Sequence, residues 1–175
     1  MEALFWLCVI AATYSYFWYP ALLSILPPRK EDSSLPAIAV RKVALVIAAR
    51  NEAAKIAGKL DNTLALERPD VELDLMVASD ASDDATDSIV RSYAEKGIRL
   101  VRSPERKGKE HAQELAIAST DADVIVFTDA GTILPKDALA HLLDAFRDPS
   151  VGAVSSVDRF ITADGTLQGE GAYVR

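Results

Sequence analysis

The sequence predicts an α/β fold, in which a mostly parallel sheet with flanking helices is preceded by one transmembrane helix. Short apolar runs alternate with segments whose apolar residues recur every three or four positions, which is typical of β-α-β units and parallel sheets. Half of the 175 residues are hydrophobic, enough for one domain with a sizeable core. The first two dozen residues differ from the rest because they carry almost no charge.

The expected strands are short apolar runs without helical periodicity. They lie at 43–49, 73–79, 98–102, 123–128 and 151–157. The expected helices lie at 52–66, 83–97, 108–120 and from Pro135 onward. In the first helix Ile56, Leu60 and Leu64 recur at a spacing of four, which places them on one face. In the second, Ser82 suits an N-cap and Gly97 suits the end of the helix.

Residues 3–26 contain no charged side chain, and this length suffices to cross a bilayer as a helix. Aromatic residues near both ends suit the membrane interfaces, and Pro20 should kink or end the regular helix. Basic residues follow the segment, whereas Glu2 precedes it, so the positive-inside rule places the remainder of the chain in the cytoplasm. We expect a single-pass anchor, with a buried helix or an uncleaved signal helix as alternatives. Residues 27–42, rich in proline, serine and mixed charges, are expected to form a linker.

Composition removes several classes of function. The net charge of −7 argues against a nucleic-acid partner, which needs a basic face. Cys8 is the only cysteine, so no intramolecular disulfide or cysteine-based metal site can form. Neither histidine has a second histidine or cysteine at ligand spacing.

The carboxyl ends of the expected strands carry the candidate site, because ligands of parallel α/β sheets bind there. Residues 50–52 after the first strand read Arg-Asn-Glu and lack the glycines of a dinucleotide-binding turn or P-loop. Asp80 ends the second strand and Asp129 the fourth, and residues 105–110 form a basic loop. One carboxylate could accept from a ribose or base, and another could hold a divalent cation that neutralises a diphosphate.

Four stretches carry a family resemblance: VALVIAARNEAAKI, LMVASDASDDATD, RKGKEHAQ and VIVFTDAGTILPKDAL. In this order they resemble the nucleotide-binding half of an inverting family-2 glycosyltransferase with a GT-A fold, over residues 43–157. The N-terminal segment is similar to the anchor of many bacterial members, which implies the inner (cytoplasmic) membrane with the soluble domain in the cytoplasm. Such enzymes transfer a sugar from a nucleotide-diphospho-sugar, usually a UDP-sugar, to a cell-surface polysaccharide (glycan) or lipid-linked acceptor.

The resemblance also implies roles for individual residues. Ala48 and Glu52 would contact the nucleoside, together with Arg50, which stands where tyrosine is common. Asp80 would bond the nucleotide base. The acids at 83–84 are better explained as stabilising the first turn of a helix.

Lys109 matches the Gly-Lys pair that lies beside the donor in this family. Asp129 falls on the first acid of the Asp-x-Asp motif, which engages the donor and its Mg²⁺ or Mn²⁺, but Gly131 stands in place of the second acid. Metal binding would then depend on Asp129 alone, with water and phosphate oxygens completing the shell.

The family's general base lies in an acceptor-binding half, of which residues 158–175 would be only the start. The catalytic base is therefore expected beyond the end of this chain, and the chain alone should be inactive in transfer. A phospho-acceptor receiver is disfavoured, because it needs an acidic pair after the first strand and a lysine after the fifth. A non-catalytic, membrane-anchored nucleotide-binding module stays open, and Gly131 favours it.

Overall fold

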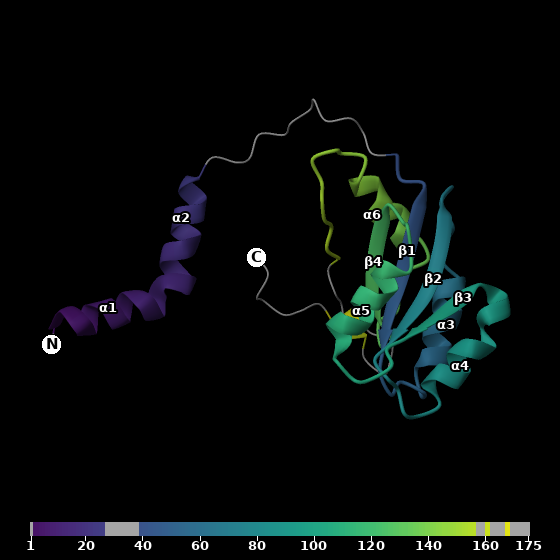
Figure 1. The fold of residues 1–175 in the computed structure, drawn as a ribbon. Coiled ribbons are helices and arrows are strands. Elements are labelled where there is room, and N and C mark those ends of the chain that lie inside the picture. The colour runs from purple at the N-terminus through teal and green to yellow at the C-terminus, as the bar shows by residue number, and fades with distance from the viewer. Residues whose placement is uncertain (1, 27–38, 157–159, 162–166, 169–175) are drawn as a thin grey trace. The chain divides into compact units, whose positions relative to one another are not determined.

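The computed structural model describes residues 2–26, 39–156, 160–161 and 167–168. The chain divides into two compact units, Met1–Ser34 and Leu35–Arg175. The first unit contains α1 (Glu2–Thr13), the π-helical turn η1 (Tyr14–Trp18) and α2 (Tyr19–Ile25), shown in Figure 1.

The helix expected at 3–26 is interrupted near Pro20, where a kink was expected. Within the described residues no single helix is long and apolar enough to cross a membrane, and the two helices reach that length only as a pair bent by 56°. The break precedes Pro20, whose ring clashes with the carbonyl four residues earlier. The backbone widens there, so that the Tyr19 N–H donates to the Tyr14 carbonyl, five residues back.

The second unit is built on a parallel sheet with the strand order β3-β2-β1-β4. The strands are β1 (Lys42–Ala49), β2 (Glu72–Ser79), β3 (Ile98–Arg102) and β4 (Val124–Asp129). The helices are α3 (Ile56–Leu64), α4 (Thr86–Ser92), α5 (Lys109–Ala118) and α6 (Ala138–Ala145). The predicted mostly parallel α/β sheet is therefore confirmed, with the first four strands within one residue of their expected ends.

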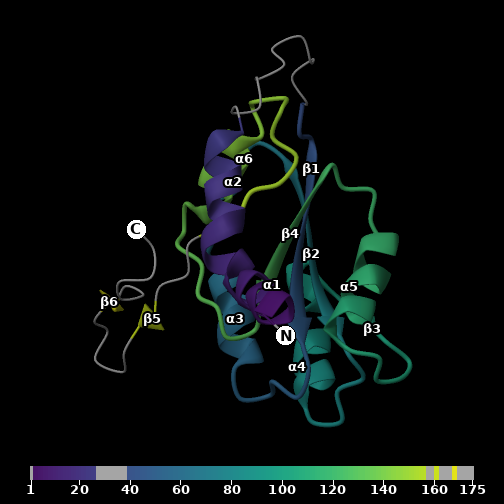
Figure 2. The same ribbon diagram turned by 90° about the vertical axis from the view of Figure 1, so that its left-hand side faces the viewer.

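Helices cover both faces of the sheet (Figure 2). On one face Leu45 and Ile47 of β1 belong to a buried cluster that includes residues of α3, α4 and α6. On the other face Ala44 and Val46 pack with Ala112 and other residues of α5. Each fully buried Leu, Ile or Val contributes about 1.5–3 kcal/mol, so the central strand is held rigidly from both sides.

The strand expected at 151–157 is wrong for its described part. Residues 151–156 pair with no strand, and all but the first are exposed. The segment VGAVSSV mixes glycine and serine with small apolar residues, so it offers too little apolar surface to bury a strand on both faces. The described residues farther along contain one short antiparallel pair, β5 (Phe160–Ile161) with β6 (Leu167–Gln168).

All four expected helices are shorter than predicted: the third spans Lys109–Ala118, and the fourth begins at Ala138 rather than at Pro135. The first begins at Ile56, because residues 50–55 form bends and turns. The second begins at Thr86, with Ala85 and not Ser82 at its N-cap. It ends at Ser92 and is followed by a 3₁₀ turn, η2 (Ala94–Lys96), which stops at Gly97 with φ +87°. The turn that shortens the first helix lies at the candidate site.

Candidate functional site

The carboxyl ends of β2, β1 and β4 lie at one edge of the sheet. Ala48 of β1 pairs in register with Ala78 of β2 and with Asp129 of β4. Asp80 follows β2 directly, and its N–H donates to the Ala49 carbonyl at 3.1 Å. The parallel register therefore brings Ala48, Asp80 and Asp129 to the edge where α/β sheets bind ligands.

The Asp80 carboxylate anchors the basic loop. It is 5% exposed, and its Oδ1 accepts from the backbone N–H groups of Lys107 and Gly108, at 2.9 and 3.0 Å. Gly108 has φ +99° and ψ +166°, a conformation that glycine alone adopts readily. Asp80 thus fixes the start of α5. Its predicted bond to a nucleotide base stays a prediction.

Lys109 and Asp129 face each other across the same edge. The Lys109 ammonium lies 2.6 Å from Asp129 Oδ1, and both side chains are more than half exposed. An exposed ion pair of this kind contributes about 1 kcal/mol or less, so a phosphate or a cation can compete for either partner.

The turn after β1 is locked to the turn after β2. Asn51 has φ +53°, its N–H donates to Ser82 Oγ at 3.2 Å, and its Oδ1 accepts from the Asp83 N–H at 3.0 Å. Ala81, next to Asp80, has φ +49°, which is rare for a residue with a Cβ. Strained backbone at two neighbouring strand ends is characteristic of functional sites.

Arg50 and Glu52, the other residues of the turn after β1, have few side-chain partners. The Glu52 N–H donates to Thr86 Oγ1 at 2.8 Å, and the Glu52 carboxylate lies 3.7 Å from the Lys55 ammonium. Arg50 has a buried Nε with no hydrogen-bond partner among the described residues. A buried donor without a partner costs about 1–3 kcal/mol, so a ligand acceptor here would be stabilised.

Acids at the start of α4 have structural partners instead. Asp84 accepts from the Thr86 N–H at 2.9 Å, the Thr86 hydroxyl at 2.5 Å and the Ala53 N–H at 3.1 Å. The Thr86 hydroxyl holds the pKa of Asp84 below its usual value. Asp87 is buried between Ser79 Oγ, at 2.6 Å, and the Arg102 guanidinium, at 3.0 Å.

Lys59 of α3 was not predicted and lies beneath the turn that follows β4. It is 3% exposed, and its ammonium donates to Thr128 Oγ1 at 2.9 Å and to the Thr132 carbonyl at 2.7 Å. Burial lowers the pKa of Lys59 to about 8, and the charge of Asp129 acts in the opposite direction. A signal existed in the sequence, because Lys59 lies three residues after Ile56 on the apolar face of its helix.

The fit of a divalent cation can be tested on the side chains at this edge. Among the residues that the structure describes, no three acidic, histidine or cysteine side chains gather to hold a metal. An ideal Cβ at Gly131 would meet nothing within 4 Å, and its φ lies outside the left-handed region, so the backbone does not require glycine. Asp129 alone suits an ion that takes its other ligands from phosphate and water.

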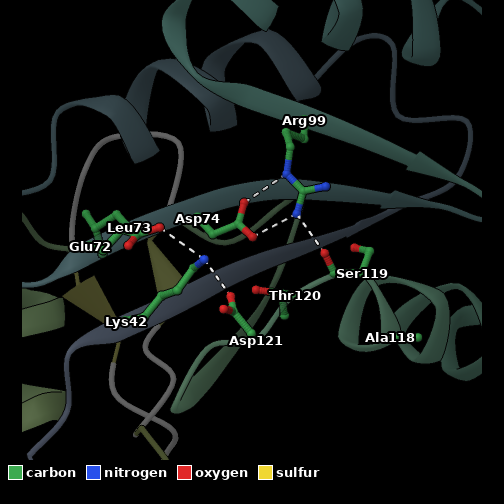
Figure 3. Close-up of a pocket in the computed structure, with 9 residues that line it drawn as sticks. All are labelled: Lys42, Glu72, Leu73, Asp74, Arg99, Ala118, Ser119, Thr120 and Asp121. Atoms are coloured by element: carbon green, nitrogen blue, oxygen red, sulfur yellow. Dashed lines mark hydrogen bonds and ion pairs between the residues drawn. The ribbon is translucent and has the colours of Figure 1, made fainter.

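A surface hollow of about 560 Å³ lies at the opposite, amino-terminal edge of the sheet (Figure 3). Lys42 there contacts Glu72 at 3.0 Å and Asp121 at 2.5 Å. Arg99 lies 2.7 Å from Asp74 and holds the pKa of that carboxyl below its usual value. These charges compensate one another, and none of the predicted site residues lines the hollow.

Carboxylates at the ends of β2 and β4, on either side of β1 and beside a basic loop, lie at the edge where α/β sheets characteristically bind ligands. Residues 44–170 match the family Glycosyl transferase family 2. The chain therefore belongs to glycosyl transferase family 2, and the resemblance seen in the sequence is confirmed.

Two curated relatives support the same family. Poly-beta-1,6-N-acetyl-D-glucosamine synthase of Staphylococcus aureus is 26% identical over 159 residues, 90% of this chain. A probable glycosyltransferase of Bacillus subtilis, YdaM, is 35% identical over 132 residues, 72% of this chain. The matched regions are 37% and 31% of these relatives' lengths.

A solved structure is similar in fold and in sequence. The mannosyltransferase PcManGT from Pyrobaculum calidifontis, in complex with GDP-Man and Mn²⁺, superimposes with a TM-score of 0.66 and 34% identity. The match covers 86% of this chain and 46% of that one. The four-stranded parallel sheet with its flanking helices is accordingly GT-A-like.

Proposed function

We propose that this chain is the donor-binding part of a glycosyltransferase that uses a nucleotide-diphospho-sugar. One observation carries the proposal: Asp80, the loop at 107–109 and Asp129 are joined by hydrogen bonds and an ion pair at one edge of the sheet. This edge offers carboxylates for hydroxyl and amide donors, and an ammonium for phosphate oxygens.

The donor would lie across the strand ends with its base toward Arg50 and Asp80. The buried Arg50 Nε and the constrained turn at Asn51 give this end fixed donors and a fixed shape. The exposed ammonium of Lys109 faces the diphosphate. Both UDP-sugars, which the resemblance favours, and GDP-sugars, as in the similar mannosyltransferase, are to be tested.

Asp129 is the residue that would hold Mg²⁺ or Mn²⁺. When bound, the ion neutralises the charge that develops on the diphosphate leaving group. Because Asp129 is the sole acid at the end of β4 and Gly131 adds none, this chain should hold the metal only together with the nucleotide. The complex of the similar mannosyltransferase with Mn²⁺ supports a divalent cation here.

The transfer itself is proposed to invert the anomeric carbon of a hexosyl donor, toward a surface polysaccharide or a lipid-linked acceptor. No residue of this chain is assigned as the general base. The uncharged, exposed aromatic side chains of the first unit, among them Trp6 of α1 and Phe17 and Trp18 of η1, support an anchor in the inner membrane with the sheet on the cytoplasmic side.

The second candidate is a non-catalytic, membrane-anchored nucleotide-binding module, favoured by the absence of a side-chain oxygen at Gly131. Titration calorimetry of the purified chain with UDP and with GDP, each with Mn²⁺, tests the binding shared by both. Asp80→Ala should abolish it. Asp123→Ala is the matched control, because Asp123 likewise accepts from two backbone N–H groups, those of Arg41 and Lys42, at the opposite edge. Equal losses in both variants, or no binding by the wild type, would contradict the proposed site.

A further inference from the structure

The turn from Thr128 to Leu134, which carries Asp129, is hydrogen-bonded to side chains of α3. Lys59 donates to Thr128 Oγ1 and to the Thr132 carbonyl, one contact on each side of Asp129. One helical turn later, Asn62 pairs reciprocally with the Leu134 backbone, donating to its carbonyl and accepting from its N–H, each at 2.9 Å. Two neighbouring side chains of one helix thus set the path of the whole turn.

Holding a turn in place with a buried lysine costs more free energy than holding it with a neutral side chain. Moving an ammonium out of water is costly, and burial lowers its pKa. Asn62 makes a comparable fastening without any charge. Unlike the Asn62 amide, the Lys59 ammonium brings a positive charge beneath the turn, and the nearby Asp129 carboxylate partly offsets the effect of burial on the pKa of Lys59.

We infer that Lys59 is a positioning residue for the donor diphosphate, which holds Asp129 at the sheet edge and supplies a fixed positive charge behind the turn. The inference rests on the proposed function. It also gives a physical meaning to Gly131: with one acid in this turn instead of two, a buried ammonium beneath it adds to the attraction for an anionic ligand. Lys109 would then meet the diphosphate from the solvent side, and Lys59 from the protein side.

The test separates diphosphate recognition from nucleoside recognition. Lys59→Met removes the charge and both hydrogen bonds at nearly constant size, and Lys59→Gln removes the charge but keeps a donor. Asn62→Leu is the matched control, because it loosens the same turn without changing charge. Affinities for UDP and for UMP, each with Mn²⁺, are measured by calorimetry on the full chain, with GDP and GMP alongside and a melting temperature for every variant.

Both Lys59 variants should bind the diphosphate about tenfold more weakly, as is typical when a residue that orients a ligand group is lost. Their affinity for the monophosphate should change less than about twofold. Asn62→Leu should melt at a lower temperature and keep the wild-type ratio of the two affinities.

Three results would overturn the inference. The first is that both Lys59 variants keep the wild-type ratio of diphosphate to monophosphate affinity. The second is that Asn62→Leu changes this ratio as much as the Lys59 variants do, which would mean that Lys59 only stabilises the turn. The third is a wild type that binds no nucleoside diphosphate, in which case the proposed function fails too. The first two leave the proposed function intact. If Lys59→Met does not fold, Lys59→Gln decides between the outcomes.

Discussion

Restoring the second acid of the metal-binding pattern should convert a donor-dependent metal site into a stronger one. Gly131→Asp places a carboxylate two residues after Asp129, and the structure has room for it, since an added Cβ meets nothing within 4 Å. The φ of Gly131 suits any residue, so the substitution should not strain the backbone.

The expected gain follows from charge and exposure. Two unit charges about 4 Å apart interact by about 1 kcal/mol in water and about 4 kcal/mol at the edge of a protein. The Asp129 side chain is 60% exposed, so the lower end of this range applies. Because Mn²⁺ carries two charges, this value doubles to about 2 kcal/mol, so a roughly 30-fold tighter affinity for Mn²⁺ is expected.

Free Mn²⁺ can be followed by electron paramagnetic resonance while the chain is titrated with and without UDP or GDP. Gly131→Asn is the control, since it has the same shape without the charge. An aspartate variant that holds Mn²⁺ no better than the asparagine variant would refute the placement of the metal at this turn.

Three further predictions concern single residues. Gly108→Ala should lower the free energy of unfolding by about 1–3 kcal/mol, because φ +99° with ψ +166° is a backbone conformation that residues with a Cβ rarely adopt. Gly152→Ala should change it by about 0.5 kcal/mol or less, and equal denaturant midpoints for the two variants would contradict this. Lys59 has a pKa of about 8 in the folded chain against an ordinary 10.5, so between these pH values the unfolded chain binds more protons than the folded one. The free energy of unfolding of the wild type, relative to that of Lys59→Met, should therefore rise by about 3 kcal/mol from pH 7 to above pH 10.5, as measured by urea unfolding. A constant difference would show that the lysine is not buried. Lys109→Met should weaken UDP or GDP binding about tenfold at low salt and by less in 0.5 M salt, because its ammonium is exposed, and salt-independent losses would contradict a direct charge contact.

The four strands and their parallel direction were predictable, because their apolar runs are long enough to be buried on both faces of a sheet. The same reasoning failed at 151–156, because a mixture of glycine, serine and small apolar residues forms a strand only where a neighbouring strand pairs with it. The kink expected at Pro20 is present as a bend just before it, whereas the π-helical form of the break could not be read from hydropathy, which measures apolar length alone.

The gathering of Asp80, Lys109 and Asp129 was predictable from one rule, that parallel strands end at a common edge. For Lys59 the sequence signals only a position on the apolar face of its helix, because helical periodicity gives neither the depth of a side chain nor its partners. The left-handed turns are an intermediate case. Asn51 is a residue type that favours this conformation, but nothing in the sequence marks Ala81.

Hydrogen–deuterium exchange tests most directly whether the donor binds at the carboxyl edge of the sheet. The exchange of the chain is compared with and without UDP–Mn²⁺, and separately GDP–Mn²⁺. Slower exchange is expected at residues 50–52, 107–109 and 129–132, with no change at 72–74 and 119–121 around the opposite hollow. Protection at that hollow, or no protection anywhere with either nucleotide, would contradict the proposed site.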